Sequence, residues 1–169
     1  MRILTEIHHN KGINTAGKMN RRSAVRAVIQ RGQELLMVFS PTIGDYKFPG
    51  GGVDNGESHE QALARELREE CGASLLGVER ELGAVIEYDF SKEKDFDTFK
   101  MTSFYYYCRA VNEFGTQKLD DYEKALGFTP VWVGIDFAIS TNHTLLKLDI
   151  APAWLQREIF VLECIRHRT

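Results

Sequence analysis

Three glutamates stand close together in one short stretch of the chain: Glu66, Glu69 and Glu70. The surrounding segment His59–Cys71 is dominated by Ala, Leu, Arg, Glu and Gln, which are strong helix formers, so it is predicted to be a helix. Residues three and four apart are neighbours on a helix, so these carboxylates share one patch and repel each other by roughly 0.2–0.5 kcal/mol per pair. The arginines between them relieve only part of this repulsion. A divalent cation explains the clustering, since carboxylate oxygens are ligands that Mg²⁺ and Mn²⁺ prefer.

A glycine-rich loop precedes this helix and favours the same chemistry. Gly50, Gly51 and Gly52 let the backbone approach a ligand closely, and Glu57 adds a fourth acid near the start of the helix. The N-terminus of a helix also supplies free N–H groups and a positive dipole end, both of which favour phosphate. A solvated charged face is the alternative interpretation of the glutamates, but the loop and the acidic helix together predict a polyphosphate site that uses a metal.

The stretch from Gly51 to Ala73 resembles the signature of the Nudix (MutT-like) hydrolases. That signature is Gly, five residues, Glu, seven residues, then Arg-Glu-aliphatic-any-Glu-Glu-any-Gly-aliphatic. The matching positions are Gly51, Glu57, Arg65, Glu66, Leu67, Glu69, Glu70, Gly72 and Ala73. Ala73 departs from the pattern, because the family carries a larger aliphatic residue there, and this departure concerns packing behind the helix. Phe48–Gly52 and Pro130–Val133 also resemble family segments, which extends the resemblance over roughly residues 23–140.

The resemblance implies an α/β fold, a Nudix-type α/β/α sandwich around a mixed sheet. It also implies a Mg²⁺ cofactor, for which Mn²⁺ can substitute. The implied ligands of the metal are one backbone carbonyl, that of Gly51, and the carboxylates of Glu57, Glu66, Glu69 and Glu70. The implied catalytic set is Glu66, Glu69 and Arg65, in which the arginine orients a glutamate through a charge-assisted hydrogen bond. The implied substrate-binding residues are Gly50, Gly51 and Gly52.

The resemblance leaves the general base open, because the family uses either a glutamate of this helix or an acid from a later loop. The later acids of this chain are Glu87, Asp89, Glu113, Asp120, Asp121 and Glu123. Each is more simply explained as a surface charge, and Glu123 leads because an acid shortly before the late Trp-containing strand recurs in the family. Arg22 or Arg26 could contact a phosphate, but solvated strand-edge residues are the simpler interpretation.

The implied reaction is hydrolysis of a diphosphate linkage in a nucleoside diphosphate derivative or a nucleoside triphosphate. Water attacks phosphorus at the metal that the glutamates bind. A nucleoside triphosphate, a nucleotide sugar and a dinucleoside polyphosphate all stay open as substrates. Two alternatives are an RNA 5′-pyrophosphohydrolase and a non-catalytic Nudix domain that senses a nucleotide. A sensor is expected to lose one or more of the glutamates, and this chain keeps all of them.

The elements that must position these residues are predicted to form one domain over residues 1–169, with a sheet flanked by two main helices. Residues 1–22 are predicted to be an irregular arm, and Ala24–Gln30 and Glu34–Phe39 a hairpin. The glutamate helix has Ser58 as its N-cap and Gly72 as its C-terminal stop. The later predicted elements are strands at Leu82–Phe90, Phe99–Val111 and Pro130–Ile135, one or two helical turns in Asp136–Asn142, and a final helix over residues 152–167.

The net charge and the hydropathy of the chain limit the classes of molecule that it is expected to bind. Lys and Arg number 21 and Asp and Glu number 24, a net charge of −3, which gives no electrostatic signature for duplex nucleic acid or an anionic membrane. The longest apolar run, Leu35–Phe39, is far shorter than the ~20 residues that span a bilayer. Residues 1–10 lack the apolar segment of a signal peptide. We therefore expect a cytoplasmic protein whose partner is a nucleotide-type diphosphate, with no duplex nucleic acid and no membrane.

The sequence leaves open whether the chain forms a homodimer. The final helix carries a broad apolar surface that could pack on the core or on a second copy. A monomer predicts that Trp154 and Phe160 are covered within the chain.

Overall fold

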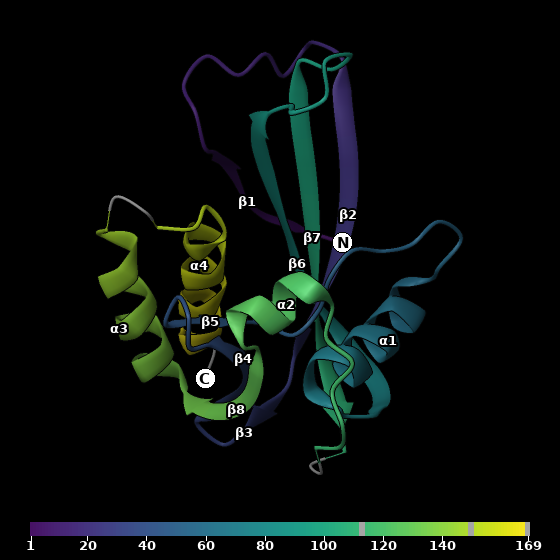
Figure 1. Cartoon of the computed structure of the whole chain (residues 1–169), viewed down its shortest axis with the longest axis vertical. Coiled ribbons are helices and arrows are strands. Elements are labelled where there is room, and N and C mark those ends of the chain that lie inside the picture. Colours follow the sequence, from purple (N-terminus) through teal and green to yellow (C-terminus); the bar gives the residue numbers. More distant parts are fainter. Residues whose placement is uncertain (112–113, 149–150, 168–169) are drawn as a thin grey trace.

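The computed structural model describes residues 1–111, 114–148 and 151–167. Within these residues the chain forms two four-stranded sheets and four helices (Figure 1). The first sheet contains β1 (Ile3–His8), β2 (Met19–Val28), β6 (Leu75–Phe90) and β7 (Thr98–Ala110). The second contains β3 (Gln30–Arg31), β4 (Glu34–Ser40), β5 (Asp45–Lys47) and β8 (Thr129–Gly134). The helices are α1 (His59–Cys71), α2 (Asp121–Leu126), α3 (Ile135–Leu146) and α4 (Trp154–Arg166).

The first sheet is mixed, as predicted, with the order β1-β6-β7-β2. The strands β6 and β7 form a long antiparallel hairpin around the polar tip at residues 91–97. At the two edges, β1 runs parallel to β6 and β2 runs parallel to β7. The glycine loop continues the sheet beyond β2, because the Val25 N–H donates to the Gly51 carbonyl at 2.9 Å and Ala24 forms a bridge with Gly52. The loop is thereby anchored to the sheet edge.

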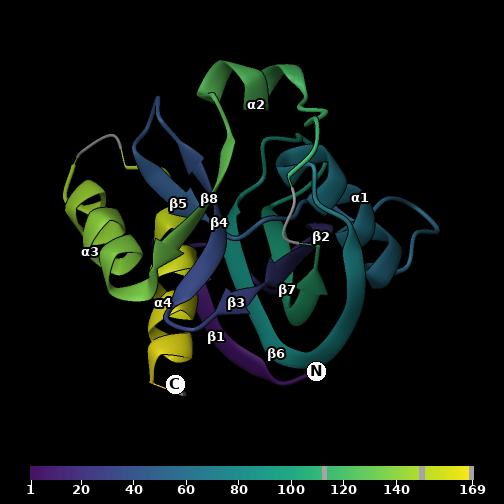
Figure 2. The same cartoon turned by 90° about the horizontal axis from the view of Figure 1, so that it is seen from below.

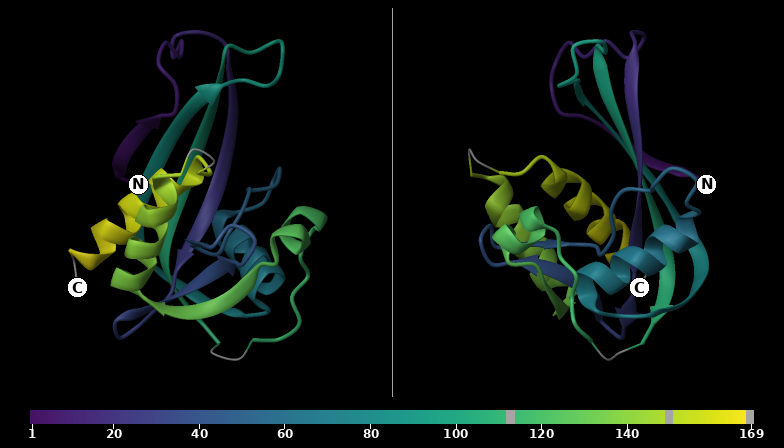
Figure 3. Two further views of the ribbon diagram at one scale, coloured as in Figure 1. Left: turned by 60° about the vertical axis from the view of Figure 1, so that its left-hand side comes forward. Right: turned by 45° about the vertical axis from the view of Figure 1, so that its right-hand side comes forward.

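Helices cover both faces of the strands, which is the predicted α/β/α sandwich. Figure 2 shows α1 on one side of the strands and α3 and α4 on the other, and the views in Figure 3 agree. Alternate residues of β2 serve the two faces: Val25 and Ala27 pack in the core cluster under α1, and Val28 packs in the cluster under α3 and α4. Along β7, Tyr105 lies on the α4 face and Tyr106 on the α1 face, so successive rings of this strand point to opposite faces of the sheet.

The glutamate helix has the predicted bounds and ends. Ser58 is the N-cap of α1, and its hydroxyl accepts from the Gln61 N–H in a capping box. Gly72 closes the helix at φ 63°, in the left-handed conformation that glycine adopts at low cost. Leu63 and Leu67, four positions apart, form the apolar stripe of α1 and are fully buried. The sequence was sufficient to predict this helix, because its helix-forming residues and its two capping residues all lie inside the helix or directly beside its ends.

Predictions for the N-terminal part were wrong in two places. Residues 1–22 do not form an irregular arm, because they contain β1 and the start of β2. The predicted hairpin of Ala24–Gln30 with Glu34–Phe39 is reduced to the two residues of β3 against β4, while β2 pairs with β7 instead. Both errors have one cause: these strands are stabilised by partners more than 70 residues away, which local patterns do not reveal.

The later elements agree with prediction in type and differ in extent. The strand β6 begins at Leu75 instead of Leu82, and α3 has 12 residues instead of one or two turns. Neither β5 nor α2 was predicted. In α2 no residue is buried, so it has no apolar stripe, and its Asp120 cap is the main local signal.

The final helix packs within the chain. Leu162 and Ile165 of α4 are fully buried, and both Phe160 and Trp154 are partly covered. Among the described residues, no helix combines the length and the apolar character needed to cross a membrane.

Candidate functional site

Three carboxylates from two helices meet beside the glycine loop. Glu66 and Glu70 lie four apart on α1 and are only 7% and 4% exposed. Glu123 joins them from α2, and one carboxylate oxygen of each residue lies within 4.8 Å of those of the other two. We call these three residues the carboxylate cluster. Glu123 was the leading candidate among the later acids, and the structure brings it to the glutamates of α1.

The glycine loop packs directly against this cluster. The Gly50 N–H donates to Glu70 Oε2 at 2.6 Å, and Gly50 has a φ of 135°, which side chains rarely adopt. A Cβ atom on Gly51 would lie 2.4 Å from Glu66 Oε1, so only glycine leaves room for that carboxylate. The backbone of the loop therefore lies closer to the carboxylates than it could if Gly51 carried a side chain.

Arg65 organises the other acids of the helix and the loop. Its guanidinium donates to both oxygens of Glu57, to Glu66 Oε1 at 2.7 Å and to Glu69 Oε2 at 3.2 Å. A fifth bond, at 2.8 Å, goes to the Gly52 carbonyl. Hydrogen bonds from Arg65 are the main reason that the pKa of Glu57 lies below its usual value. Arg65 thus holds glutamates of the loop and the helix through hydrogen bonds, and its role in a reaction stays a prediction.

The implied metal ligands fall into two groups in this geometry. Glu66 and Glu70 belong to the carboxylate cluster, whereas Glu57 and the half-exposed Glu69 are held by Arg65. The Gly51 carbonyl accepts the Val25 N–H and lies at the sheet edge beside the cluster. Direct coordination of a metal stays a prediction for all five residues, Glu66 and Glu70 included.

Burial shapes the charge state of the cluster. It raises the pKa of Glu66 and the pKa of Glu123 above the usual value. It raises the pKa of Glu70 to about 8. For Glu70 the Gly50 hydrogen bond opposes the shift, and for Glu66 the Arg65 hydrogen bond does. Hard oxygen donors that are buried together and repel each other fit a divalent cation such as Mg²⁺ or Mn²⁺, whose charge offsets both effects.

Two cations near the cluster were not assigned to the site from the sequence. Lys47 of β5 is largely buried, which lowers its pKa, and the charge of Glu70 opposes that shift. Its ammonium lies 3.5 Å from the ring centre of Phe128. Arg26 on β2, one of the two arginines offered above as a phosphate contact, is half-buried, and its Nε is buried without a hydrogen-bond partner among the described residues. Sequence reasoning missed Lys47, because its only sequence signal is that it is a single cation directly before Phe48–Pro49.

The remaining later acids lie outside the carboxylate cluster. Glu87 forms a buried pair with Arg157 at 2.6 Å, and Asp89 accepts from Asn10. Asp120 caps α2 and Asp121 is fully exposed. Glu113 lies outside the described residues.

Comparison with known proteins agrees with this geometry. The family model of the NUDIX domain matches residues 20–147. The "RNA pyrophosphohydrolase" of a Nitratiruptor species is 44% identical over 48 residues, which are 28% of this chain and 31% of that protein. The "CTP pyrophosphohydrolase" of Escherichia coli is 39% identical over 75 residues, 42% of this chain and 50% of that protein. The chain thus aligns with no more than half the length of either of these two curated relatives.

Solved structures support the same fold. A NUDIX hydrolase from Nitrosomonas europaea has a TM-score of 0.56 at 24% identity, covering 88% of each chain. A MutT protein from Methanosarcina mazei Go1 has a TM-score of 0.54 at 18% identity, covering 88% of this chain and 96% of that one. The glutamates of α1, the glycine loop and the family match point to one conclusion: the chain belongs to the NUDIX domain family.

Proposed function

We propose that the chain hydrolyses a diphosphate linkage in a nucleotide-type substrate, with Mg²⁺ or Mn²⁺ held by Glu66 and Glu70 of the carboxylate cluster. The observation that carries this proposal is the convergence of Glu66 and Glu70 with Glu123 beside Gly50–Gly52. Family membership supports the same chemistry, since the curated relatives are named as pyrophosphohydrolases. When bound, the cation neutralises phosphate oxygens and the charge that develops on them in the transition state.

The residues of the chain would divide the remaining tasks. Lys47 and Arg26 lie within the electrostatic reach of Glu70 and supply positive charge for phosphate oxygens. Arg65 keeps Glu66 in place and does not touch the substrate. Glu123 accepts a proton from the attacking water, and the water oxygen forms a bond to phosphorus while the bridging P–O bond breaks. A raised carboxylate pKa suits this proton acceptor, because a general base works best when its pKa approaches the working pH.

A second candidate is removal of pyrophosphate from RNA 5′ ends. It is favoured by the 44% identity to the "RNA pyrophosphohydrolase" of the Nitratiruptor species over 48 residues. The net charge of −3 counts against a long nucleic-acid track, because phosphate contacts along a strand require clustered Lys and Arg. The same hydrolysis assay separates the two candidates when it includes a short RNA with a 5′ triphosphate.

The test is a phosphate- and pyrophosphate-release screen with Mg²⁺ over nucleoside triphosphates, nucleotide sugars, dinucleoside polyphosphates and that RNA. It is run beside Glu70→Gln and Glu123→Gln, which keep side-chain size and remove the charge. Glu70→Gln can still accept the Gly50 N–H, so folding is expected to persist. Glu60→Gln is the matched control, because Glu60 is an exposed residue of the first turn of α1.

We expect hydrolysis of one substrate class, lost with EDTA and reduced by about 100-fold or more in the two cluster variants. Glu60→Gln should keep full activity. Hydrolysis that persists in EDTA, or in Glu70→Gln at the rate of the unmodified protein, would contradict the proposal. Nucleotide binding without any hydrolysis would instead favour the sensor alternative.

A further inference from the structure

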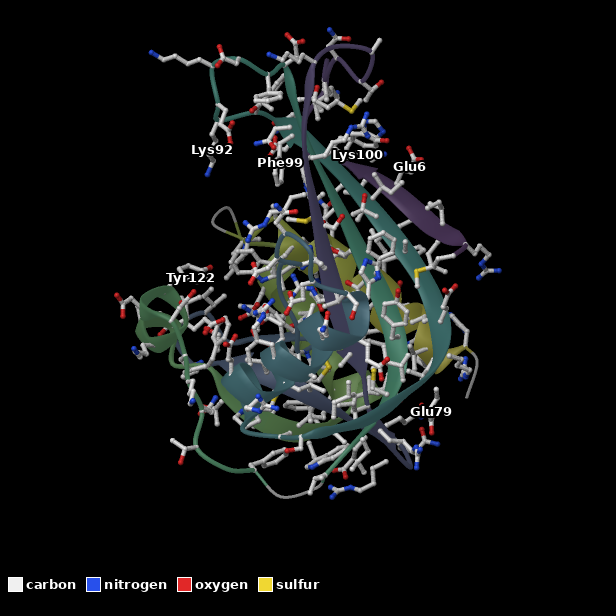
Figure 4. The ribbon with its side chains drawn as sticks, turned by 90° about the vertical axis from the view of Figure 1, so that its right-hand side faces the viewer. Glu6, Glu79, Lys92, Phe99, Lys100 and Tyr122 are labelled. Carbon is white, nitrogen blue, oxygen red and sulfur yellow. The ribbon has the colours of Figure 1, made fainter. Side chains whose placement is uncertain are left out.

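A second cavity, of about 180 Å³, lies between the first sheet and the start of α4. Its walls include Phe99 and Met101 of β7 and Trp154 of α4, and we call this cavity the slot. Figure 4 labels Phe99 on β7 and Tyr122 on α2, and the two residues lie in different parts of the molecule. Trp154 and Arg157, which also lines the slot, are outside residues 20–147 that match the family. The slot is therefore partly built from chain that the family match does not cover.

The walls and the polar edge of the slot have different chemistry. Phe99, Met101 and Trp154 present flat or adaptable apolar surfaces, which suit a planar ring. On the neighbouring strand β6, Asp89 is paired in register with Phe99, and Glu87 with Met101. A planar ring between the apolar walls would therefore have carboxylates beside it.

Only one of these carboxylates has an oxygen left for a ligand. Glu87 is held at both oxygens, by His9 at 3.1 Å and by Arg157 at 2.6 Å. In Asp89, Oδ1 accepts from the Asn10 side chain at 2.6 Å and from the Phe90 N–H at 2.7 Å. Asp89 Oδ2 accepts no hydrogen bond from the described residues. The slot thus offers a fixed hydrogen-bond acceptor beside a ring-sized apolar opening.

Lys47 and a row of buried side chains on β7 lie between the slot and the carboxylate cluster. The Lys47 ammonium lies 5.2 Å from the ring centre of Trp154 and is also attracted by Glu70. Along β7, Tyr105 and Ser103 share the face of Met101, and the four steps of the strand from Tyr105 to Met101 span about 13 Å. The Tyr105 hydroxyl and Ser103 Oγ are buried without a hydrogen-bond partner among the described residues. Such unpaired polar atoms call for a bound ligand or water beside them.

We propose that the slot holds the base of the substrate nucleotide and selects a base with an exocyclic amino group, which donates to Asp89 Oδ2. This proposal rests on the proposed function, in which the substrate is a nucleotide. Carboxylates accept from the amino group of cytosine in protein–nucleic acid contacts, whereas uracil presents a carbonyl oxygen at that position and would be repelled.

The test uses Trp154 as a reporter of slot occupancy. Since the chain has two tryptophans, Trp132→Phe in the full chain leaves Trp154 as the sole tryptophan fluorophore. It is titrated in EDTA with the 5′-monophosphates of cytidine, adenosine, guanosine and uridine, which contain no diphosphate linkage. We expect the first three to change the fluorescence and uridine monophosphate to bind about tenfold more weakly than cytidine monophosphate, the cost of one lost hydrogen bond to a charged acceptor.

Two variants in this background make the test specific. Asp89→Asn keeps the acceptor for Asn10 and Phe90 and replaces the carboxylate with an amide that also donates, so the preference for amino-bearing bases should disappear. Phe99→Leu should weaken all four ligands alike. Glu79→Gln is the matched control, because Glu79 is exposed and pairs with Arg109 elsewhere on the sheet. Equal binding of all four ligands, or a preference that survives Asp89→Asn, would overturn the proposal.

The two proposals can fail separately, because this titration needs no hydrolysis. Base-selective binding by a protein that hydrolyses nothing would leave the slot assignment standing and overturn the proposed function. Hydrolysis by a protein whose Trp154 does not respond to any monophosphate would do the reverse.

Discussion

Arg65 and Glu57 are joined by two hydrogen bonds of 2.9 Å, from Nε to Oε1 and from Nη2 to Oε2. The same guanidinium reaches Glu66 through Nη1 at 2.7 Å. One planar side chain therefore connects the loop before α1 to a member of the carboxylate cluster. A lysine offers a single charged point and cannot reproduce this fork.

The first prediction follows from that fork. Arg65→Lys keeps the charge but loses the paired bonds to Glu57, so Glu66 is expected to lose its fixed orientation. We expect kcat to fall by about 10- to 100-fold, the range seen when groups that orient metal ligands are removed. Steady-state kinetics against Mg²⁺ concentration measures this effect. Arg68→Lys, at an exposed position of the same helix, serves as control, and equal kinetics in both variants would contradict the role of Arg65.

A second prediction concerns the space that Gly51 leaves for Glu66. Gly51→Ala places a Cβ 2.4 Å from Glu66 Oε1, and the flexible carboxylate must move away. The backbone of Gly51 has no positive φ, so alanine is allowed there and the free energy of unfolding should change by only about 1 kcal/mol. Activity and Mg²⁺ affinity should nevertheless fall by about tenfold or more.

Denaturant unfolding and metal titration of Gly51→Ala separate these two effects. Gly77→Ala is the control, because a Cβ there meets no atom within 4 Å and that glycine has no positive φ either. Full Mg²⁺ affinity in Gly51→Ala would refute the idea that the glycine is required for the position of Glu66.

The third prediction links protons to metal binding at Glu70. Burial raises its pKa from the ordinary 4.5 to about 8, so the folded protein without metal keeps a proton that the unfolded chain loses in this window. The free energy of unfolding of the metal-free protein should therefore decrease as the pH rises from 4.5 towards 8. Metal ligation requires the carboxylate and releases the proton, so Mg²⁺ affinity should rise by up to about tenfold per pH unit in this window.

Calorimetry in two buffers of different ionisation enthalpy counts the released proton. Glu70→Gln should bind Mg²⁺ more weakly and with less dependence on pH, whereas Glu60→Gln should retain the slope. An affinity that does not change with pH in the unmodified protein would show that Glu70 is already ionised before the metal binds.

The sequence by itself determined those features that depend only on residues close together in the chain. The composition of His59–Cys71 and its flanking Ser58 and Gly72 defined α1, because helix propensity and capping act over one turn. The spacing of Glu66 and Glu70 placed both carboxylates on one face, since positions four apart are neighbours on a helix. The glycines before α1 predicted a close approach of backbone to a ligand, which stays a prediction, and in the structure the backbone of Gly51 lies close to the Glu66 carboxylate. These residues were sufficient to identify the family.

Only the tertiary structure decided which distant residues complete the site. Glu123 was favoured from the sequence only by the family resemblance, because α2 is a short helix without any buried residue and has no apolar pattern, and the tertiary structure brings it to the cluster. Lys47 lies on a three-residue strand whose position depends on pairing with β4. Arg157 meets Glu87 across 70 positions of sequence because α4 packs on the sheet. Strand register and helix docking depend on burial against remote partners, and this information does not exist in any local stretch of the chain.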